Sequence, residues 1–177
     1  MAVGKSTACR ALVGRLPGCV VIDTDILSTE MVATTQPEPD YERFHDVLLQ
    51  LALEIGASGL SVLYNGPVLP RQVESSPLSA QFDIRWLALV ADSETRFRRA
   101  RTRGSDAAFY DRHRAIHDAL DSELRLIARE HRQMQLLDTA AMSPHDVVRA
   151  TEDWAASALA NESEGGHETT DTVDRTR

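Results

Sequence analysis

The chain has 177 residues, the length of one domain that can bury a substantial core. Its content of 42% hydrophobic and 26% charged residues is that of an ordinary globular protein. A net charge of −8 argues against a general binder of nucleic acid or of anionic membranes, because those surfaces attract positively charged proteins.

The chain opens on Gly4-Lys5-Ser6-Thr7, the last positions of the phosphate-binding pattern G-x-x-x-x-G-K-[ST]. In this pattern backbone N–H groups and the positive N-terminus of the next helix bind phosphate. The lysine reaches the β- and γ-phosphates, and the Ser/Thr hydroxyl binds Mg²⁺. We therefore assign Gly4 and Lys5 to phosphate binding, Ser6 to the metal and Thr7 to the α-phosphate.

The front half of this pattern is missing. Its first glycine belongs two places before Met1, and the strand that leads into the loop is absent from the chain as given. A parallel sheet that lacks one of its inner strands has unpaired backbone groups and exposed apolar helix faces. We expect the natural protein to begin about 8 to 20 residues upstream, since one strand at ~3.3 Å per residue requires that length.

Two carboxylates follow the first apolar run of the chain. Residues 19–22 are apolar on both faces, as in a parallel strand covered by helices, and they lead into Asp23 and Asp25. Side chains at the carboxyl end of such a strand point into the ligand crevice. We assign Asp23 to Mg²⁺ and Asp25 to accepting the proton of an attacking hydroxyl. The alternative for Asp25 is the N-cap of a helix over residues 26–32.

Helical and strand-like patterns alternate along the chain. We expect helices over residues 5–16, 41–56, 93–103, 110–131 and 144–160, and strands over residues 19–22, 60–64, 86–90 and 135–138. Residues 67–77 are expected to form a long loop above the sheet, and residues 161–177 a disordered acidic tail. This alternation predicts one α/β domain over residues 1–160, with a parallel sheet between two layers of helices.

Asn65 closes the second expected strand, where a carboxylate would supply charge to a metal. An amide orients a water or contacts substrate, so the binding of Mg²⁺ depends on Ser6 and Asp23. Arg71, in the loop over residues 67–77, has two readings that stay open: it binds an acidic substrate, or it is simply exposed.

Cysteine and histidine spacing gives no metal signature. Cys9 and Cys19 belong to no C-x-x-C or Cys/His cluster, which predicts free thiols in a reducing compartment. His113 and His117 are four residues apart, but no third ligand follows, which argues against zinc. No apolar stretch approaches the ~20 residues that span a bilayer, and the N-terminus lacks a signal-peptide layout, so we expect a cytoplasmic protein.

The order G-K-S-T, then a strand ending in D-x-D, then an arginine-rich region resembles the P-loop small-molecule kinases over about residues 1–158. Shikimate kinase, gluconate kinase and chloramphenicol phosphotransferase are the nearest types, and the wider group is often described as AAA family ATPases. The resemblance implies a P-loop NTPase fold, a three-layer α/β/α sandwich with a parallel sheet, whose first strand is missing here.

The resemblance also implies roles for arginines and for one loop. A lid over about residues 104–115 would follow Arg103, which would stack on adenine. Arg112 or Arg114 would contact the transferred phosphoryl group, a task that suits a planar, bidentate cation. The segment over residues 138–142 would wrap the adenine. The residue-level alternative for these arginines is a solvated helix face with i,i+4 charge pairs.

Two functions remain open at this stage. The first is a kinase that uses ATP and Mg²⁺ to phosphorylate a small-molecule acceptor, acting as a monomer or homodimer without nucleic acid or membrane; Asp25 and the arginines favour it. The second is an ATP-binding or regulatory protein without turnover, including an inactive P-loop NTPase, which the missing strand and first glycine favour.

Overall fold

The computed structural model describes residues 2–25, 27, 41–104 and 107–165. It contains the strands β1 (Cys19–Asp23), β2 (Ser61–Asn65), β3 (Trp86–Val90) and β4 (Met134–Asp138). β1 pairs in parallel with β2, and β3 pairs in parallel with β4. The predicted parallel α/β arrangement is confirmed, but within the described residues the sheet consists of two separate halves.

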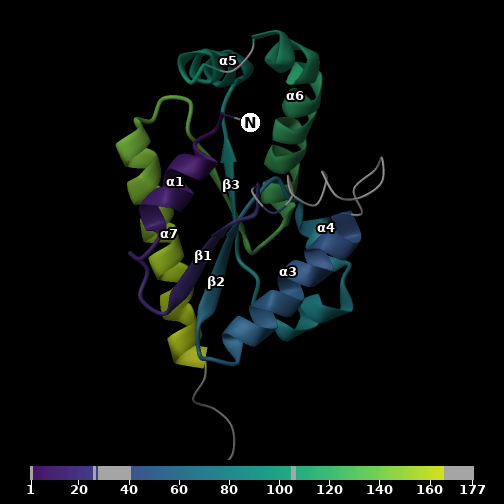
Figure 1. The fold of residues 1–177 in the computed structure, drawn as a ribbon, viewed down its shortest axis with the longest axis vertical. Coiled ribbons are helices and arrows are strands. Elements are labelled where there is room, and N and C mark those ends of the chain that lie inside the picture. The colour runs from purple at the N-terminus through teal and green to yellow at the C-terminus, as the bar shows by residue number, and fades with distance from the viewer. Residues whose placement is uncertain (1, 26, 28–40, 105–106, 166–177) are drawn as a thin grey trace, which may run out of the picture.

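Helices cover both sides of these strands. They are α1 (Lys5–Leu12), α3 (Tyr41–Gly56), α4 (Pro70–Glu74), α5 (Ser93–Thr102), α6 (Ala107–Glu130) and α7 (Pro144–Gly165), with a 3-10 helix η1 (Pro77–Gln81). α1 and α7 lie on one side of the strands, and α3, α4 and α6 lie on the other (Figure 1). This is the three-layer order expected of a P-loop NTPase fold. No helix among the described residues is both long enough and apolar enough to cross a membrane.

Several predicted boundaries were wrong for local reasons. α1 ends at Leu12 rather than at residue 16, because Val13 leaves the helical conformation with a ψ of 121° and Gly14 takes a φ of 73°. The expected loop over residues 67–77 contains α4, which Pro70 starts at its first turn. α7 runs to Gly165, so the expected tail begins in a helix. Residues 166–177 lie outside the described part of the chain.

The carboxyl ends of all four strands meet at one edge. Asn65, at the end of β2, donates its side-chain N–H to Asp23 at the end of β1. Thr139, just after β4, donates its backbone N–H to the carbonyl of Val90 at the end of β3, at 2.8 Å. The hydroxyl of Thr139 also lies 3.0 Å from the carbonyl oxygen of Val3. The two halves therefore run in the same direction, with the N-terminal loop at their carboxyl ends.

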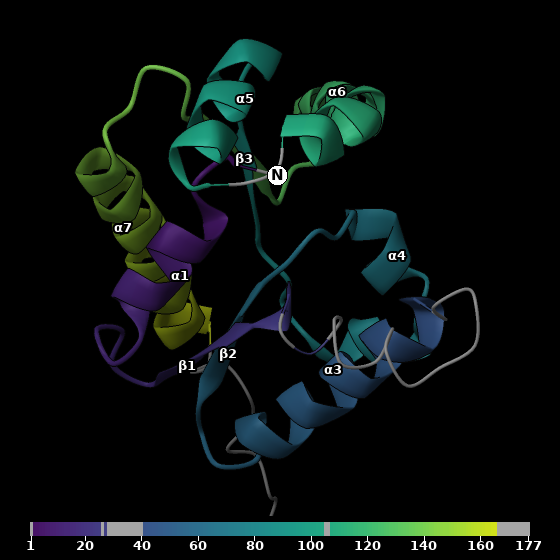
Figure 2. The ribbon, with the colours of Figure 1, turned by 45° about the horizontal axis from the view of Figure 1, so that its top comes forward.

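Separate apolar clusters support the two halves. Leu12, Leu16 and Ala155 pack α1 and α7 against β1 and β2. Leu124 packs α6 against Ala88, Val90 and Met134 of β3 and β4. A third cluster bridges the halves, because it joins residues of the N-terminal loop, α1 and α7 to the end of β3: Val3, Ala8, Leu89, Ala91 and Val147. Figure 2 shows the β1–β2 pair set apart from β3, with α1 and α7 beside both.

Candidate nucleotide-binding site

Gly4 starts α1 in a conformation that favours glycine. Its φ is 106°, in the left-handed region, and its carbonyl accepts the first helical bond from the N–H of Ala8 at 3.0 Å. A Cβ at this position would lie 3.1 Å from Cγ1 of Val147. Backbone conformation and close packing therefore both select glycine where the phosphate-binding pattern requires it.

Lys5 and Asp25 form the central pair of the site. The ammonium Nζ of Lys5 lies 3.8 Å from Oδ2 of Asp25, and the two side chains are 13% and 42% exposed. Lys5 is the first residue of α1, and Asp25 follows the end of β1. The fold thus brings together the lysine of the phosphate loop and the second carboxylate of the D-x-D sequence.

Asp23 is held by two neighbours. Its Oδ1 accepts hydrogen bonds from Nδ2 of Asn65 and from the backbone N–H of Asp25, both at 3.2 Å. Residues 24 and 25 are helical, so Asp23 occupies the capping position that the alternative reading gave to Asp25. Most of the predicted helix over residues 26–32 lies outside the described residues. Asn65 therefore orients the carboxylate that was predicted to face the metal.

Thr24 fastens the ends of β1 and β2 together. Its hydroxyl donates to the carbonyl oxygen of Asn65 at 2.9 Å. A Cβ on the next residue, Gly66, would lie 2.1 Å from Oγ1 of Thr24, which is too close for any side chain. In the Asn-Gly sequence that closes β2, Asn65 therefore accepts this hydrogen bond and Gly66 leaves room for the Thr24 side chain. The sequence analysis did not predict this role.

The predicted arginines take different positions. Arg103, at the C-terminal cap of α5, donates from Nη2 to the hydroxyl of Thr7 at 3.3 Å. Arg114 donates from Nε to the hydroxyl of Ser93 at 2.9 Å, which directs it to the start of α5. Arg112 is exposed on α6. Of these three, Arg103 is the one that the structure brings to the residues of the phosphate loop.

Arg99 was not singled out by the sequence. Its guanidinium donates to the carbonyl oxygens of Thr139 and Met142, at 2.6 and 3.2 Å. It thereby holds the segment over residues 138–142 that was predicted to wrap adenine. Burial lowers the pKa of Arg99 below its ordinary value, and the positive charges of Arg103 and Arg98 lower this pKa further. Four arginines lie along α5 and a fifth, Arg103, caps it, and spacing alone does not separate them.

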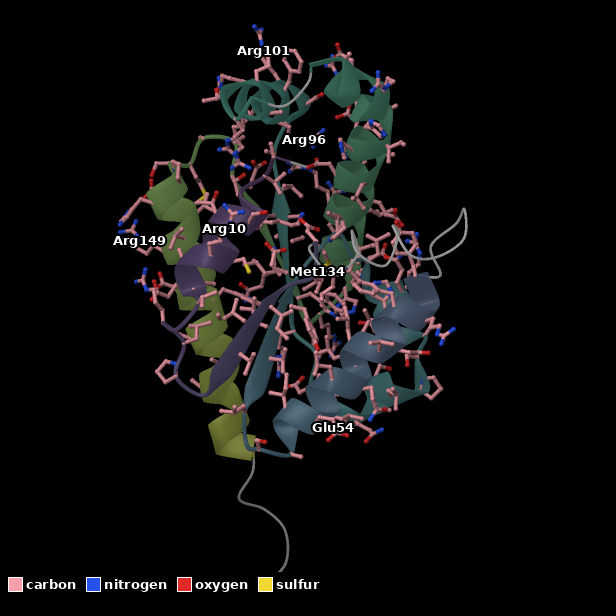
Figure 3. The ribbon with its side chains drawn as sticks, in the orientation of Figure 1. Arg10, Glu54, Arg96, Arg101, Met134 and Arg149 are labelled. Carbon is pink, nitrogen blue, oxygen red and sulfur yellow. The ribbon has the colours of Figure 1, made fainter. Side chains whose placement is uncertain are left out.

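Two further arginines form ion pairs between helices. Arg96 is 1% exposed, where α5 meets α6 (Figure 3), and donates to the carbonyl oxygen of Ala91 at 2.6 Å. It pairs with Asp118 and, at 3.1 Å, with Asp121. Arg71 pairs with Glu123 of α6, and its side chain is 63% exposed. These contacts fasten α5 and α4 to α6.

The match to a protein family covers the core of this site. The family model for the AAA domain (AAA_33) matches residues 1–127. The chain belongs to the AAA domain family. This family has the P-loop NTPase fold, so the protein is a nucleotide-binding P-loop protein. A comparison with curated proteins finds no match.

The AAA domain has donors that suit Mg²⁺. No group of three or more His, Cys, Asp or Glu side chains forms a metal cluster among the residues that the structure describes. Mg²⁺ in nucleotide sites does not require one, because it takes one or two protein oxygens and fills its octahedron with phosphate and water. The hydroxyl of Ser6, at the start of α1, and the carboxylate of Asp23 are oxygen donors of this kind, and Asn65 already fixes Asp23.

Proposed function

We propose that this AAA domain is an ATP-dependent kinase that transfers the γ-phosphoryl group to a small-molecule acceptor. The observation that carries the proposal is the 3.8 Å separation between Nζ of Lys5 and Oδ2 of Asp25. A mechanical ATPase needs no carboxylate for an acceptor, whereas a kinase needs one beside the phosphates to receive the proton of the attacking hydroxyl.

The residues divide the work between them. The backbone N–H groups at the start of α1 and the ammonium of Lys5 bind the β- and γ-phosphates. Phosphate oxygens compete with Asp25 for Lys5, which leaves the carboxylate available to the acceptor hydroxyl. Arg103, next to Thr7, lies at the nucleotide end of the site. Ser6 and Asp23 would hold Mg²⁺, which neutralises charge on the phosphates when bound.

An ATP-binding protein without turnover is the second candidate. The position of Arg114 favours it, because Arg114 is engaged with Ser93 and lies 3.9 Å from Asp118 rather than contacting Lys5 or Asp25. A P-loop protein without an arginine on the transferred phosphoryl group still binds the nucleotide, but it transfers the γ-phosphoryl group slowly.

An Asp25→Asn variant separates the two candidates. We expect phosphoryl transfer to fall by about 10²- to 10⁴-fold, the usual contribution of a general base, while ATP affinity is largely retained. Product formation is followed over a panel of nucleosides, sugar acids and antibiotics, and ATP binding by titration. Asp153→Asn, at an exposed position of α7, is the matched control.

Each result decides between the candidates. Transfer at the wild-type rate in Asp25→Asn removes Asp25 from the reaction. ATP binding by the unmodified chain without product from any acceptor supports the second candidate. Loss of ATP binding in Asp25→Asn assigns the residue to nucleotide binding instead.

A further inference from the structure

The first turns of α3 lie at the edge of the sheet that carries the candidate site. Residues 57–60 alone connect α3 to β2, so the helix runs antiparallel to the strand against which it packs (Figure 1). The hydroxyl of Tyr64, near the carboxyl end of β2, donates to the carbonyl oxygen of Leu48 at 2.5 Å. Phe44 and His45 precede Leu48 by about one helical turn, which places them beside the carboxyl ends of the strands.

His45 is a buried histidine with an unsatisfied ring nitrogen. The residue is 5% exposed, and its Nδ1 has no hydrogen-bond partner in the described part of the chain. The ring of Phe44 lies beside it, with 5.7 Å between the ring centroids. Burial lowers the pKa of His45, so the ring is neutral at pH 7 and carries one N–H donor and one acceptor nitrogen. Buried polar atoms of this kind are usually satisfied by protein, water or a ligand.

His45 lines the same cavity as residues of the candidate site. Lys5, Thr24 and Asn65 line this cavity at the carboxyl ends of the strands. Apolar residues of α3 and of the segment after β2 line it as well: Phe44, Leu48, Pro67 and Val68. An apolar wall with few polar groups binds an apolar body and orients it through those groups. His45 is thus available to a molecule that approaches Lys5.

The described charges in the wall of this cavity are already paired. Among the residues that the structure describes, the charged side chains in the wall are Lys5, Asp83 and Arg85. Arg85 pairs with Asp83 at 2.6 Å, and both lie before β3, at the opposite end of the strands. Lys5 pairs with Asp25 and would bind the nucleotide phosphates. An anionic group of the acceptor would therefore lose its water beside His45 without gaining a countercharge, which is unfavourable.

We propose that His45 is a specificity-determining residue of the acceptor site, and that the acceptor is an uncharged alcohol with an apolar ring and a second hydrogen-bonding group. The ring packs against Phe44 and Val68, the second group bonds to His45, and the hydroxyl faces Asp25. This inference rests on the proposed kinase function and names its class of acceptor. Sugar acids and nucleoside monophosphates carry an anion that the described wall does not neutralise.

The test uses pairs of alcohols that differ only in charge. One pair is para-(hydroxymethyl)benzamide and para-(hydroxymethyl)benzoate, and the corresponding cyclohexane amide and carboxylate form another. Binding to the 177-residue chain is measured without nucleotide, by calorimetry and by the ring nitrogen chemical shifts of the histidines. Phosphoryl transfer from ATP to the same alcohols is measured separately. The variants are His45→Leu, which removes the polar atoms, and His45→Gln, which retains a donor and an acceptor, with His145→Leu at a largely exposed position as control.

We expect each amide to bind about tenfold or more tightly than its carboxylate, and to shift the ring nitrogens of His45 but not those of His145. His45→Leu should weaken amide binding about tenfold, whereas His45→Gln should retain part of the affinity. The urea midpoint of His45→Leu should be unchanged or higher, because apolar atoms replace an unsatisfied buried nitrogen. A residue with a purely structural role would instead lose stability together with affinity.

Carboxylates that bind as tightly as their amides would overturn the inference, because the site would then not select against charge. Unshifted ring nitrogens in wild-type His45, or unchanged amide affinity in His45→Leu, would remove His45 from the acceptor site. The wild-type measurements decide the question even if His45→Leu does not fold. Amides that bind at His45 without phosphoryl transfer to any alcohol would support the site and contradict the kinase function, so the two failures are distinguishable.

Discussion

The guanidinium of Arg99 donates hydrogen bonds to two atoms of Thr139, the carbonyl oxygen at 2.6 Å and the hydroxyl oxygen at 3.0 Å. The same hydroxyl lies 3.0 Å from the carbonyl oxygen of Val3 and 3.1 Å from that of Val90. Thr139 is completely buried. One residue thus joins the phosphate loop, the end of β3, α5 and the segment predicted to contact adenine.

Replacing Arg99 by lysine should weaken the binding of the adenine base of ATP. A lysine cannot reproduce the forked contacts to Thr139 and Met142, and loss of one or two of them should cost about 1–3 kcal/mol of stability. We expect weaker binding of ATP and unchanged binding of inorganic tripolyphosphate, both measured by calorimetry. Arg98→Lys, at an exposed position of the same helix, is the control. An equal loss for both ligands would place the effect at the phosphate loop.

A side chain at Gly66 should destabilise the fold. In Gly66→Ala the new Cβ would clash with Oγ1 of Thr24, and overpacking of this kind costs about 1–3 kcal/mol. Urea unfolding measures the loss. Gly56→Ala is the control, because a Cβ at the end of α3 meets no atom within 4 Å. The pair Thr24→Ala and Gly66→Ala should recover part of the loss, and no recovery would mean that the clash is not the cause.

The buried Arg96 should contribute more to stability than any exposed arginine of α5. Arg96→Met removes the buried cation that pairs with Asp121, which is 13% exposed, and with Asp118, which is 44% exposed. Breaking a fully buried pair costs about 3–5 kcal/mol, and the exposure of Asp118 should reduce this loss. Arg101 points away from the body of the molecule (Figure 3) and stacks on Phe97 at 5.7 Å. Arg101→Met should therefore cost less than about 1 kcal/mol. Chemical unfolding of both variants tests the ranking, and equal losses would contradict it.

Stability should fall as the pH decreases through about 6.5. Burial lowers the pKa of His45 in the folded protein, although the charge of Asp46 opposes the shift. Burial also lowers the pKa of His117. As the pH decreases, these two histidines therefore bind protons at a higher pH in the unfolded chain than in the folded protein. The free energy of unfolding is steady above about pH 6.5 and decreases below it.

The variant His45→Gln should flatten this pH dependence, with His145→Gln at a largely exposed position as control. Urea unfolding between pH 8 and pH 5 provides the measurement. The pKa of Asp138 is lowered by its hydrogen bond with Arg125, so its contribution is lost only near and below pH 3.8, outside this window. An unchanged slope in His45→Gln would exclude His45 as the origin.

Periodicity in the sequence was sufficient for the main elements. The run of apolar residues over β3 gave its bounds without error, because an uninterrupted apolar segment before Asp92 has no helical alternative of that length. The proximity of Lys5 and Asp25 followed from a general rule, that carboxyl ends of parallel strands share one edge with the helix N-termini.

Long-range contacts were beyond reach of the sequence. Nothing in the arginine spacing distinguishes Arg99, which contacts residues forty positions away, from Arg101, which faces solvent. The helix α4 lies in a stretch with several prolines that reads as loop, yet the side chain of Gln72 accepts the N–H of Leu69 and completes its first turn. Strand pairing within each half-sheet is likewise a tertiary property.

The two halves of the sheet carry different residues of the candidate site. Asp23 and Asp25 follow β1 in one half, while Thr139 follows β4 in the other. A rotation of one half relative to the other would change the separation of these acidic groups from the segment predicted to contact adenine, while every existing strand pair stayed intact. The packing that joins the two halves, rather than any single side chain, thus sets this separation.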